Sequence, residues 1–249
     1  HVRSRRQRQM CIRDRVSLHA GPAPLNLAPL PPGAAVAPGL ATVHADAALL
    51  AFDKPSGLLS VPGRGPDKQD CLATRAQASY ADARVVHRLD MATSGLIVMA
   101  RGLEMQRRLS QCFADRHTHK AYVALADGWL AEDDGEIDLP LLTDWPNRPR
   151  QKIDPVLGKP SQTRWRVLAR LQDASGQPCT RLALIPITGR THQLRVHLLA
   201  LGHALLGDTL YASAEVQQRA PRLMLHAQAL RLPHPETGAT LALTCPAPF

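Results

Sequence analysis

The chain has 249 residues, of which 45% are hydrophobic, enough for one large domain or for two half-domains that share a cleft. No apolar run approaches the roughly 18 residues that a membrane helix needs, so we expect a cytoplasmic protein with no membrane partner. The formal charge of +9 favours a polyanionic partner, although charge alone does not distinguish nucleic acid from an anionic membrane.

The cysteines are five in number, lie far apart and include no CxxC pair. An odd, scattered set of this kind argues against a disulfide framework and against a cysteine metal or redox centre. We therefore expect reduced cysteines.

The charge is concentrated at the start of the chain. Residues 1–15 hold six arginines and one acid, and the remaining 24 basic and 20 acidic residues give only +4. We interpret residues 1–15 as non-native sequence, since they lack helical periodicity and apolar anchors; a basic arm that binds nucleic acid is the alternative. Residues 16–40 are rich in Pro, Ala and Gly and are expected to stay disordered. The predicted division is an N-terminal segment over 1–40 and one folded domain over 41–249.

Within the folded domain, short β-like runs alternate irregularly with helical patterns. The predicted strands cover residues 48–52, 85–86, 95–100, 120–126, 163–171, 181–187 and 222–232. Because helices do not regularly separate these strands, the pattern predicts a mixed α+β domain around a large sheet rather than a doubly wound parallel sheet.

Three helices are predicted from apolar spacing and capping residues. The first covers residues 70–80, with Asp70 as its cap, and the second covers 103–113. The third begins at Thr191, whose hydroxyl is suited to cap the first turn.

The segment with the strongest chemical signal runs from Val85 to Arg101 and reads VVHRLDMATSGLIVMAR. It places Asp90 between two apolar β-like runs, directly before a Thr-Ser-Gly turn. An acid in this position lies on a loop at the end of sheet strands. From composition alone, an ordinary turn aspartate is the alternative interpretation.

This segment resembles the HRLDxxTSG hallmark of the RluA-type family of RNA pseudouridine synthases. The likeness continues in order through FDKPSGLLSVPGR (52–64), KAYVALADG (120–128), GRTHQLRVHLLALGH (189–203), GDTLY (207–211) and RLMLHAQALRLPHPETG (222–238). The resemblance implies an α+β fold in which helices flank a large, mixed, mainly antiparallel sheet around a central catalytic cleft. The stretch DLPLLTDWPNRPRQK (138–152) further resembles the dual-specificity branch, which implies a tRNA anticodon stem-loop (position 32) and/or 23S rRNA as substrate.

The reaction implied by the resemblance converts uridine to pseudouridine and requires no cofactor and no metal. Asp90 is the implied nucleophile, because a carboxylate is ionised at neutral pH and is a competent leaving group. Its transient adduct forms with either the ribose carbon or the uracil ring. Tyr122 is the implied residue that stacks on the base and helps to remove the ring proton. Arg195 is expected to pair with Asp90 in bidentate geometry and so to keep it charged in a dry pocket.

Further motif residues receive supporting roles. Arg88 is expected to fill the space left by a flipped uridine, with a plain phosphate contact as the alternative. Lys54, in a KPxG motif, is expected to hold a loop near the cleft. The other residues that the motifs place around the site are His87, Leu89, Thr93, Gly95, Arg190, His192 and Gln193.

Two other function classes compete with this interpretation. The first is a catalytically silent RNA-binding protein of the same fold. The second is a metal-dependent hydrolase built on the histidines, although no HExxH or similar ligand spacing is present. RNA is the expected partner, and no obligatory protein partner is predicted.

Overall fold

The computed structural model describes residues 39–249. The expectations for residues 1–15 and for most of the segment 16–40 therefore lie outside the described residues. None of the helices in the described part is long and apolar enough to cross a membrane.

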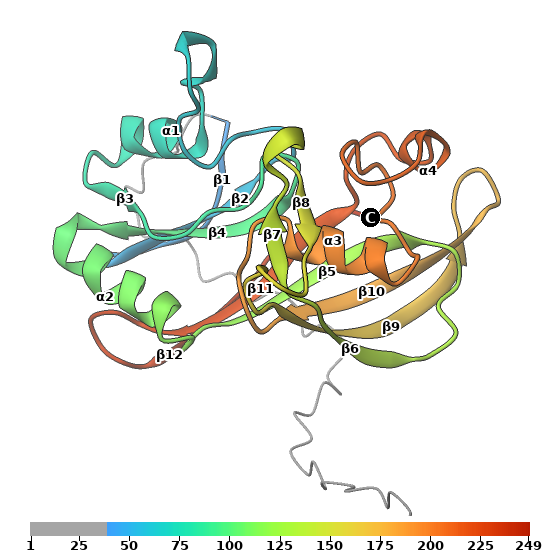
Figure 1. The fold of residues 1–249 in the computed structure, drawn as a ribbon. Coiled ribbons are helices and arrows are strands. Elements are labelled where there is room, and N and C mark those ends of the chain that lie inside the picture. The colour runs from blue at the N-terminus through green and yellow to red at the C-terminus, as the bar shows by residue number, and fades with distance from the viewer. Residues whose placement is uncertain (1–38) are drawn as a thin grey trace, which may run out of the picture.

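A ten-stranded sheet runs through the molecule (Figure 1). Its strands are β1 (Ala41–Ala45), β2 (Leu49–Lys54), β3 (Ala83–Val85), β4 (Ser94–Arg101), β5 (His119–Asp127), β6 (Asp134–Asp138), β9 (Gln162–Gln172), β10 (Pro178–Pro186), β11 (Leu225–Pro233) and β12 (Thr240–Thr244). The main path is β1-β2-β4-β11-β5-β10-β9-β6, with β3 beside β4 and β12 beside β11. Of these pairings only β4 with β11 is parallel, so the predicted mixed, mainly antiparallel sheet is confirmed.

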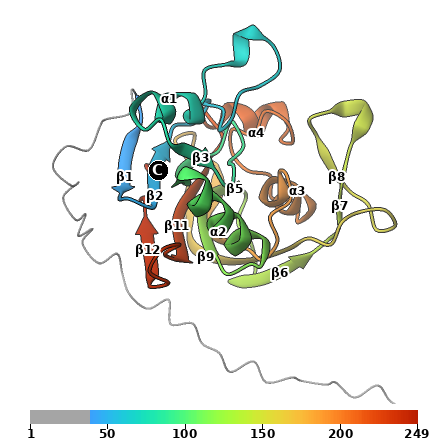
Figure 2. The same ribbon diagram turned by 90° about the vertical axis from the view of Figure 1, so that its left-hand side faces the viewer.

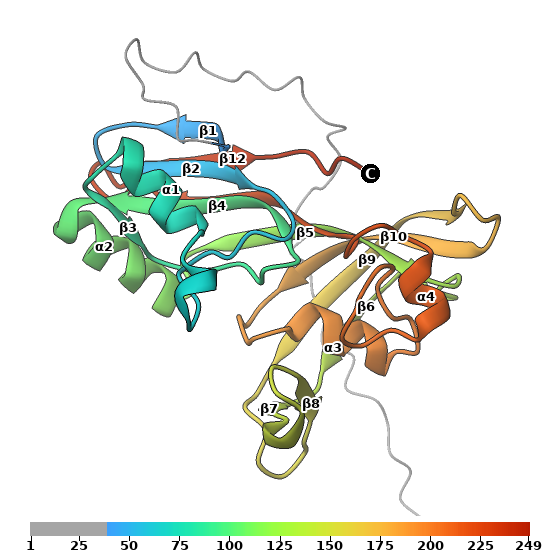
Figure 3. The same ribbon diagram turned by 90° about the horizontal axis from the view of Figure 1, so that it is seen from above.

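The remaining elements of residues 39–249 are four helices, two 3-10 turns and a separate hairpin. The helices are α1 (Leu72–Ser79), α2 (Gly102–Ala114), α3 (Gln193–Ala200) and α4 (Ala214–Gln218), and the 3-10 turns cover Pro66–Lys68 and Trp145–Asn147. The hairpin pairs β7 (Leu141–Thr143) with β8 (Gln151–Ile153). Figures 2 and 3 both show this hairpin projecting beyond α3.

Both predicted helix caps are wrong. The Sγ of Cys71 caps α1 by accepting from the Thr74 amide, while Asp70 pairs with Arg75 instead. Helix α3 begins at Gln193 without a side-chain cap from Thr191. The Gln193 side chain folds back and accepts from the Arg190 amide, which satisfies the turn before the helix in another way.

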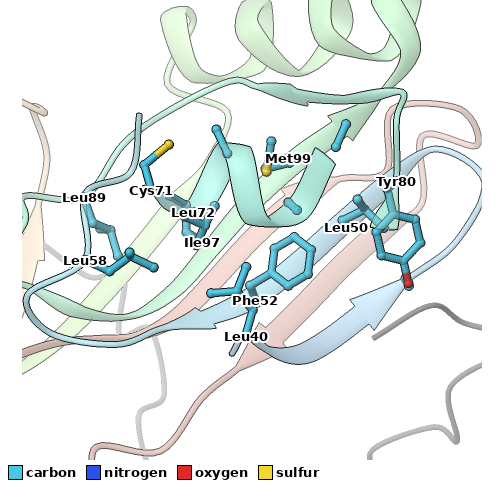
Figure 4. Packing of buried hydrophobic residues seen from close by; sticks show 14 of the residues in the cluster. Leu40, Leu50, Phe52, Leu58, Cys71, Leu72, Tyr80, Leu89, Ile97 and Met99 are labelled. Atoms are coloured by element: carbon cyan, nitrogen blue, oxygen red, sulfur yellow. The ribbon is translucent and has the colours of Figure 1, made fainter. Parts of the chain in front are cut away.

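Strands β2 and β4 are buried on both faces, which explains their unbroken apolar runs. One face packs on α1 in a cluster that includes Leu50, Phe52, Ile97 and Met99 (Figure 4). Alternate residues of the same strands point the other way and pack with Leu109 of α2. Helices α1 and α2 therefore cover opposite faces of this half of the sheet (Figure 1).

The other half of the sheet carries α3. Leu194 and Leu198 of this helix pack in a cluster with residues of β5 and β10 such as Ala124, Leu182 and Leu184. Tyr122 of β5 packs against both this cluster and the α1 cluster. Tyr122 thus lies where the two halves of the sheet meet.

The parallel contact between β4 and β11 requires glycine at one position. Gly95 pairs with Ala227 and has a φ of 106°, a backbone conformation that favours glycine. A Cβ at this position would lie 2.4 Å from the Ala227 carbonyl oxygen. The strands could not approach so closely with any other residue.

We expect Gly95→Ala to lower the free energy of unfolding by about 3 kcal/mol, since it adds a backbone clash to an unfavourable φ. Urea denaturation measures the change. Gly238→Ala is the matched control, because Gly238 has a φ of 72° with nothing within 4 Å of its Cβ position. That variant carries the φ penalty alone, about 1 kcal/mol. Equal losses in both variants would contradict the steric argument.

Candidate active site

A pocket of about 470 Å³ lies between the two halves of the sheet, a size typical of sites that hold small ligands. One wall is the segment 87–90 with the end of α2, and the other is the segment 186–195 that leads into α3. Asp90 is the single carboxylate among the lining residues. Five cations share the lining with it: Arg88, Arg116, Lys120, Arg190 and Arg195.

The loop that carries Asp90 is held by its backbone. Thr93 donates its amide to the Asp90 carbonyl at 3.1 Å, which closes a turn. The Ser60 hydroxyl donates to the Leu89 carbonyl at 2.7 Å and accepts from the Leu89 amide at 3.1 Å. The Ser56 hydroxyl donates to the Ala92 carbonyl at 2.7 Å. The segment 54–60 thus fixes the loop on both sides of Asp90.

Lys54 makes the central contacts between the segment 54–60 and the loop that carries Asp90. Its side chain is completely buried, and its Nζ donates to the carbonyls of Pro55, Leu58 and Met91 at 2.9, 2.7 and 3.1 Å. Burial lowers the pKa of Lys54 to about 8, against the opposing pull of Asp90 and Asp53. At neutral pH the group is therefore still an ammonium, whose three N–H groups match three acceptors. Lys54 is not among the residues that line the pocket.

The expected bidentate pair between Asp90 and Arg195 is wrong. The guanidinium donates its Nε and one terminal nitrogen to Asp208, at 2.7 and 2.6 Å. The Asp208 side chain is fully buried, whereas that of Asp90 is 24% exposed, so Asp208 has the greater need of a cation. Asp208 also accepts from the amides of Leu210 and Tyr211. Sequence reasoning missed this role of Asp208, although the GDTLY segment contained it.

Arg195 nevertheless lines the same pocket as Asp90 and contributes charge to it. Burial alone would lower the pKa of Arg195, but its bonds to Asp208 and the more distant charge of Asp90 raise it overall. The side chain stays cationic. Asp90 therefore faces a fixed positive charge that it does not directly bind.

The nearest imidazole to the Asp90 carboxylate belongs to His192. Its Nε2 lies 4.0 Å from Asp90 Oδ2, and its Nδ1 lies 2.7 Å from the hydroxyl of Tyr211. Tyr211 accepts in turn from the backbone amide of Gln151 on β8, at 2.8 Å. Tyr211 is a second residue near the site that the sequence analysis did not single out.

Tyr122 lines the pocket from β5. Burial, assisted by the negative charge of Asp90, raises the pKa of its phenol well above the ordinary value. The hydroxyl is therefore neutral at any physiological pH. Arg88 is exposed at the pocket, two residues before Asp90.

His87 lines the same pocket, but its contacts indicate a structural role. Its Nε2 accepts from the Val98 amide at 3.0 Å, and its ring stacks on Phe113 with centroids 4.5 Å apart. Burial, with a smaller contribution from Lys120, lowers the pKa of His87 to about 3. This histidine is neutral and supports the wall that Phe113 forms.

One group in the described chain has the side chains of a metal site. Asp53, His226 and Cys245 place one ligand atom each within 4.8 Å of one another. Both ring nitrogens of His226 already have protein partners at 2.9 Å, namely the Ser94 hydroxyl and the Cys245 carbonyl. This histidine could bind an ion only by giving up one of these contacts, and none of the three residues lines the pocket.

Comparison with known proteins gives a consistent result. Residues 48–200, more than half of the chain, match the family described as RNA pseudouridylate synthase. A Yersinia pestis protein named dual-specificity RNA pseudouridine synthase RluA is 50% identical over 207 residues, which cover 83% of this chain and 98% of the relative. The protein of that name from Escherichia coli strain K12 is 48% identical over 212 residues, covering 85% of this chain and 95% of the relative.

A solved structure is also similar. Human RNA Pseudouridylate Synthase Domain Containing 1 superposes with a TM-score of 0.73 and 30% identity. The match covers 88% of this chain and 87% of the human chain.

We expect Lys54→Met to lower the free energy of unfolding by about 2 to 4 kcal/mol, because it leaves buried carbonyls without donors. Hydrogen exchange should also become faster at the amides of residues 89–93, since the loop loses its central contact. Lys68→Met, at an exposed position, is the control and should change neither quantity. An unchanged exchange rate in the Lys54 variant would show that the loop is held by other contacts.

Proposed function

The chain belongs to the RNA pseudouridylate synthase family, and from this premise we propose that Asp90 is the nucleophile with which it converts uridine to pseudouridine. The protein is an isomerase that acts on uridine in RNA. The observation that carries the assignment of Asp90 is that it is the single carboxylate lining a pocket with five cations.

The reaction requires few residue types. Pseudouridine contains the same atoms as uridine, with the base joined to ribose through carbon rather than nitrogen. The enzyme breaks the glycosidic bond, holds and turns the free base, and forms the new bond. A carboxylate with a fixed position suits this series of steps, because it can attack as a nucleophile and later depart as a leaving group. Asp90 forms its adduct with either the ribose carbon or the uracil ring, and both routes use the same carboxylate.

We assign Tyr122 and Arg195 to support of this step. The ring of Tyr122 offers a flat apolar face on which a released uracil can stack. Its neutral phenol favours this stacking role over removal of a proton. The cation of Arg195, fixed by Asp208, stabilises the negative charge of Asp90 from across the pocket.

Arg88 is our candidate for base flipping. Its exposed side chain lines the pocket beside the nucleophile, where it can occupy the space that a rotated uridine leaves. A contact with phosphate is the alternative for the same side chain.

We propose two RNA substrates, a tRNA anticodon stem-loop and a hairpin of 23S rRNA. The support is the name dual-specificity RNA pseudouridine synthase borne by several relatives that are 45 to 50% identical. A cytoplasmic location accords with substrates of this kind.

The projecting hairpin of β7 and β8 is suited to contact this RNA. Trp145 at its tip is 64% exposed, and the guanidinium of Arg148 lies 4.5 Å from the centre of its ring. Arg150 and Lys152 follow on the same hairpin. An exposed aromatic ring among cations is the combination that binds nucleotides through stacking and through phosphate contacts.

We expect Asp90→Asn to abolish pseudouridine formation while RNA affinity stays within about threefold, because the nucleophile is lost and the cationic lining is kept. Single-turnover assays with unmodified anticodon stem-loop and 23S fragments, with nucleotide-resolution mapping, measure the product. Asp67→Asn, at an exposed carboxylate, is the control. Product formation by the Asp90 variant would refute the assignment, and loss of activity on exhaustive chelation would favour a metal-dependent enzyme.

We expect Trp145→Ala to weaken RNA binding about tenfold, since stacking on one aromatic ring contributes roughly 1 to 3 kcal/mol. The single-turnover rate at saturating RNA should not change, because the hairpin tip is not part of the pocket lining. Trp129→Ala is the matched control, since Trp129 is 54% exposed on another loop. Equal effects of the two replacements would argue against contact between the hairpin tip and RNA.

A further inference from the structure

We propose that His192 is a positioning residue for this reaction, which holds the Asp90 carboxylate through an Nε2–H group whose tautomer is set by Tyr211. The proposal rests on the function proposed for Asp90. It adds a residue that orients the nucleophile, and it involves no proton transfer from the imidazole.

The hydrogen-bond chain favours one ring nitrogen as the site of the proton. The Gln151 amide can only donate, so the Tyr211 oxygen is the acceptor in that 2.8 Å contact. Within the described residues, His192 Nδ1 is the acceptor available to the Tyr211 hydroxyl, at 2.7 Å. We infer that the hydroxyl donates to Nδ1; Nδ1 is then unprotonated, and the neutral imidazole carries its hydrogen on Nε2. That nitrogen is the one directed at Asp90.

The electrostatic surroundings favour the neutral ring. Burial lowers the pKa of His192, and the cations of Arg195 and Arg88 act in the same direction. The carboxylates of Asp90 and Asp208 oppose this effect without reversing it. A neutral Nε2–H can orient a carboxylate and leave its charge intact, whereas an imidazolium could transfer a proton to it and remove the nucleophile.

The distance between the two groups is short enough for a small adjustment to make a hydrogen bond. Nε2 lies 4.0 Å from Asp90 Oδ2, about 1 Å beyond a hydrogen bond. Such contacts are commonly long in free enzymes and shorten when substrate binds. A bond to Oδ2 would leave Oδ1 as the oxygen that attacks the substrate.

The backbone at His192 supports a functional reason for the histidine. Its φ is 53°, and Arg116 is the only other non-glycine residue in the described chain with a positive φ. Asparagine, like histidine, is enriched in this conformation, and it is the better residue at a helix N-cap. His192 occupies the N-cap position of α3 without making a side-chain cap. Backbone preference therefore does not select histidine over asparagine at this position.

Two substitutions separate the proposal from a structural role. In His192→Gln the side-chain amide nitrogen can replace Nε2 as a donor to Asp90, although the backbone fits less well. In His192→Asn the side chain reaches only the Nδ1 position, so the donor to Asp90 is lost while the backbone is favoured. We expect the single-turnover rate at saturating RNA to fall about 100-fold in the Asn variant and less than about tenfold in the Gln variant. The Kd for RNA should stay within about threefold in both, because neither changes the cationic lining.

The opposite order, with the Asn variant as active as the Gln variant or more so, would overturn the proposal. Tyr211→Phe gives an independent check that keeps the His192 ring. Introduced into the wild-type enzyme, it should slow the reaction about tenfold, because the His192 tautomer is no longer fixed by the Tyr211 hydroxyl. Introduced into the His192→Asn enzyme, it should cause no further loss of rate. Additive losses would show that Tyr211 acts by another route, and urea denaturation confirms that each variant is folded.

The same experiment distinguishes failure of this proposal from failure of the proposed function. If the wild-type protein forms no pseudouridine, or if Asp90→Asn remains active, the proposed function itself is wrong. If wild type is active and Asp90→Asn is inactive, but His192→Asn matches His192→Gln, only the role of His192 is wrong.

Discussion

The arrangement of the whole site depends on one buried ammonium group. Lys54 satisfies three carbonyl oxygens with its three N–H groups, and one of these carbonyls belongs to the residue next to Asp90. Two serines of the same segment bind the backbone at Leu89 and Ala92. Because all these contacts go to backbone atoms, the Asp90 side chain is left unused by the scaffold. A reactive carboxylate can thus have a fixed position without being neutralised by the group that fixes it.

The different environments of Asp208 and Asp90 also keep the Asp90 carboxylate free of a direct partner. Asp208 is fully buried and takes the bidentate pair with Arg195, while Asp90 remains partly exposed in the pocket. A direct ion pair with Asp90 would have to be broken before the carboxylate could attack a substrate. The arrangement instead places a cation in the same pocket as Asp90 without a direct bond, which leaves the lone pairs of the carboxylate available.

The sequence predicted the elements that are determined by short-range patterns of apolar residues. The runs at 48–52 and 95–100 become β2 and β4. These strands bury both faces, so they appear in the sequence as unbroken apolar runs that are easy to recognise. The short strands β1, β6 and β12 were missed, since each has five residues and a largely exposed side. The cap at Thr191 failed because Gln193 binds the preceding turn, a contact that spacing does not reveal. The family resemblance brought Asp90, Tyr122 and Arg195 to one pocket, but it did not predict that Asp208 competes for the guanidinium.

The buried pair of Arg195 and Asp208 has an evolutionary consequence. Loss of either partner alone would strand an unpaired charge in the interior, which is far more damaging than replacing both together. A lineage cannot drift at one position while the other stays constant, so the two sites are expected to be inherited as a unit. Gly207 narrows the choice further, because a Cβ there would lie 1.9 Å from the Arg222 carbonyl oxygen. Mutational freedom near this enzyme's pocket is thus restricted by Gly207 and Asp208, neither of which lines the pocket.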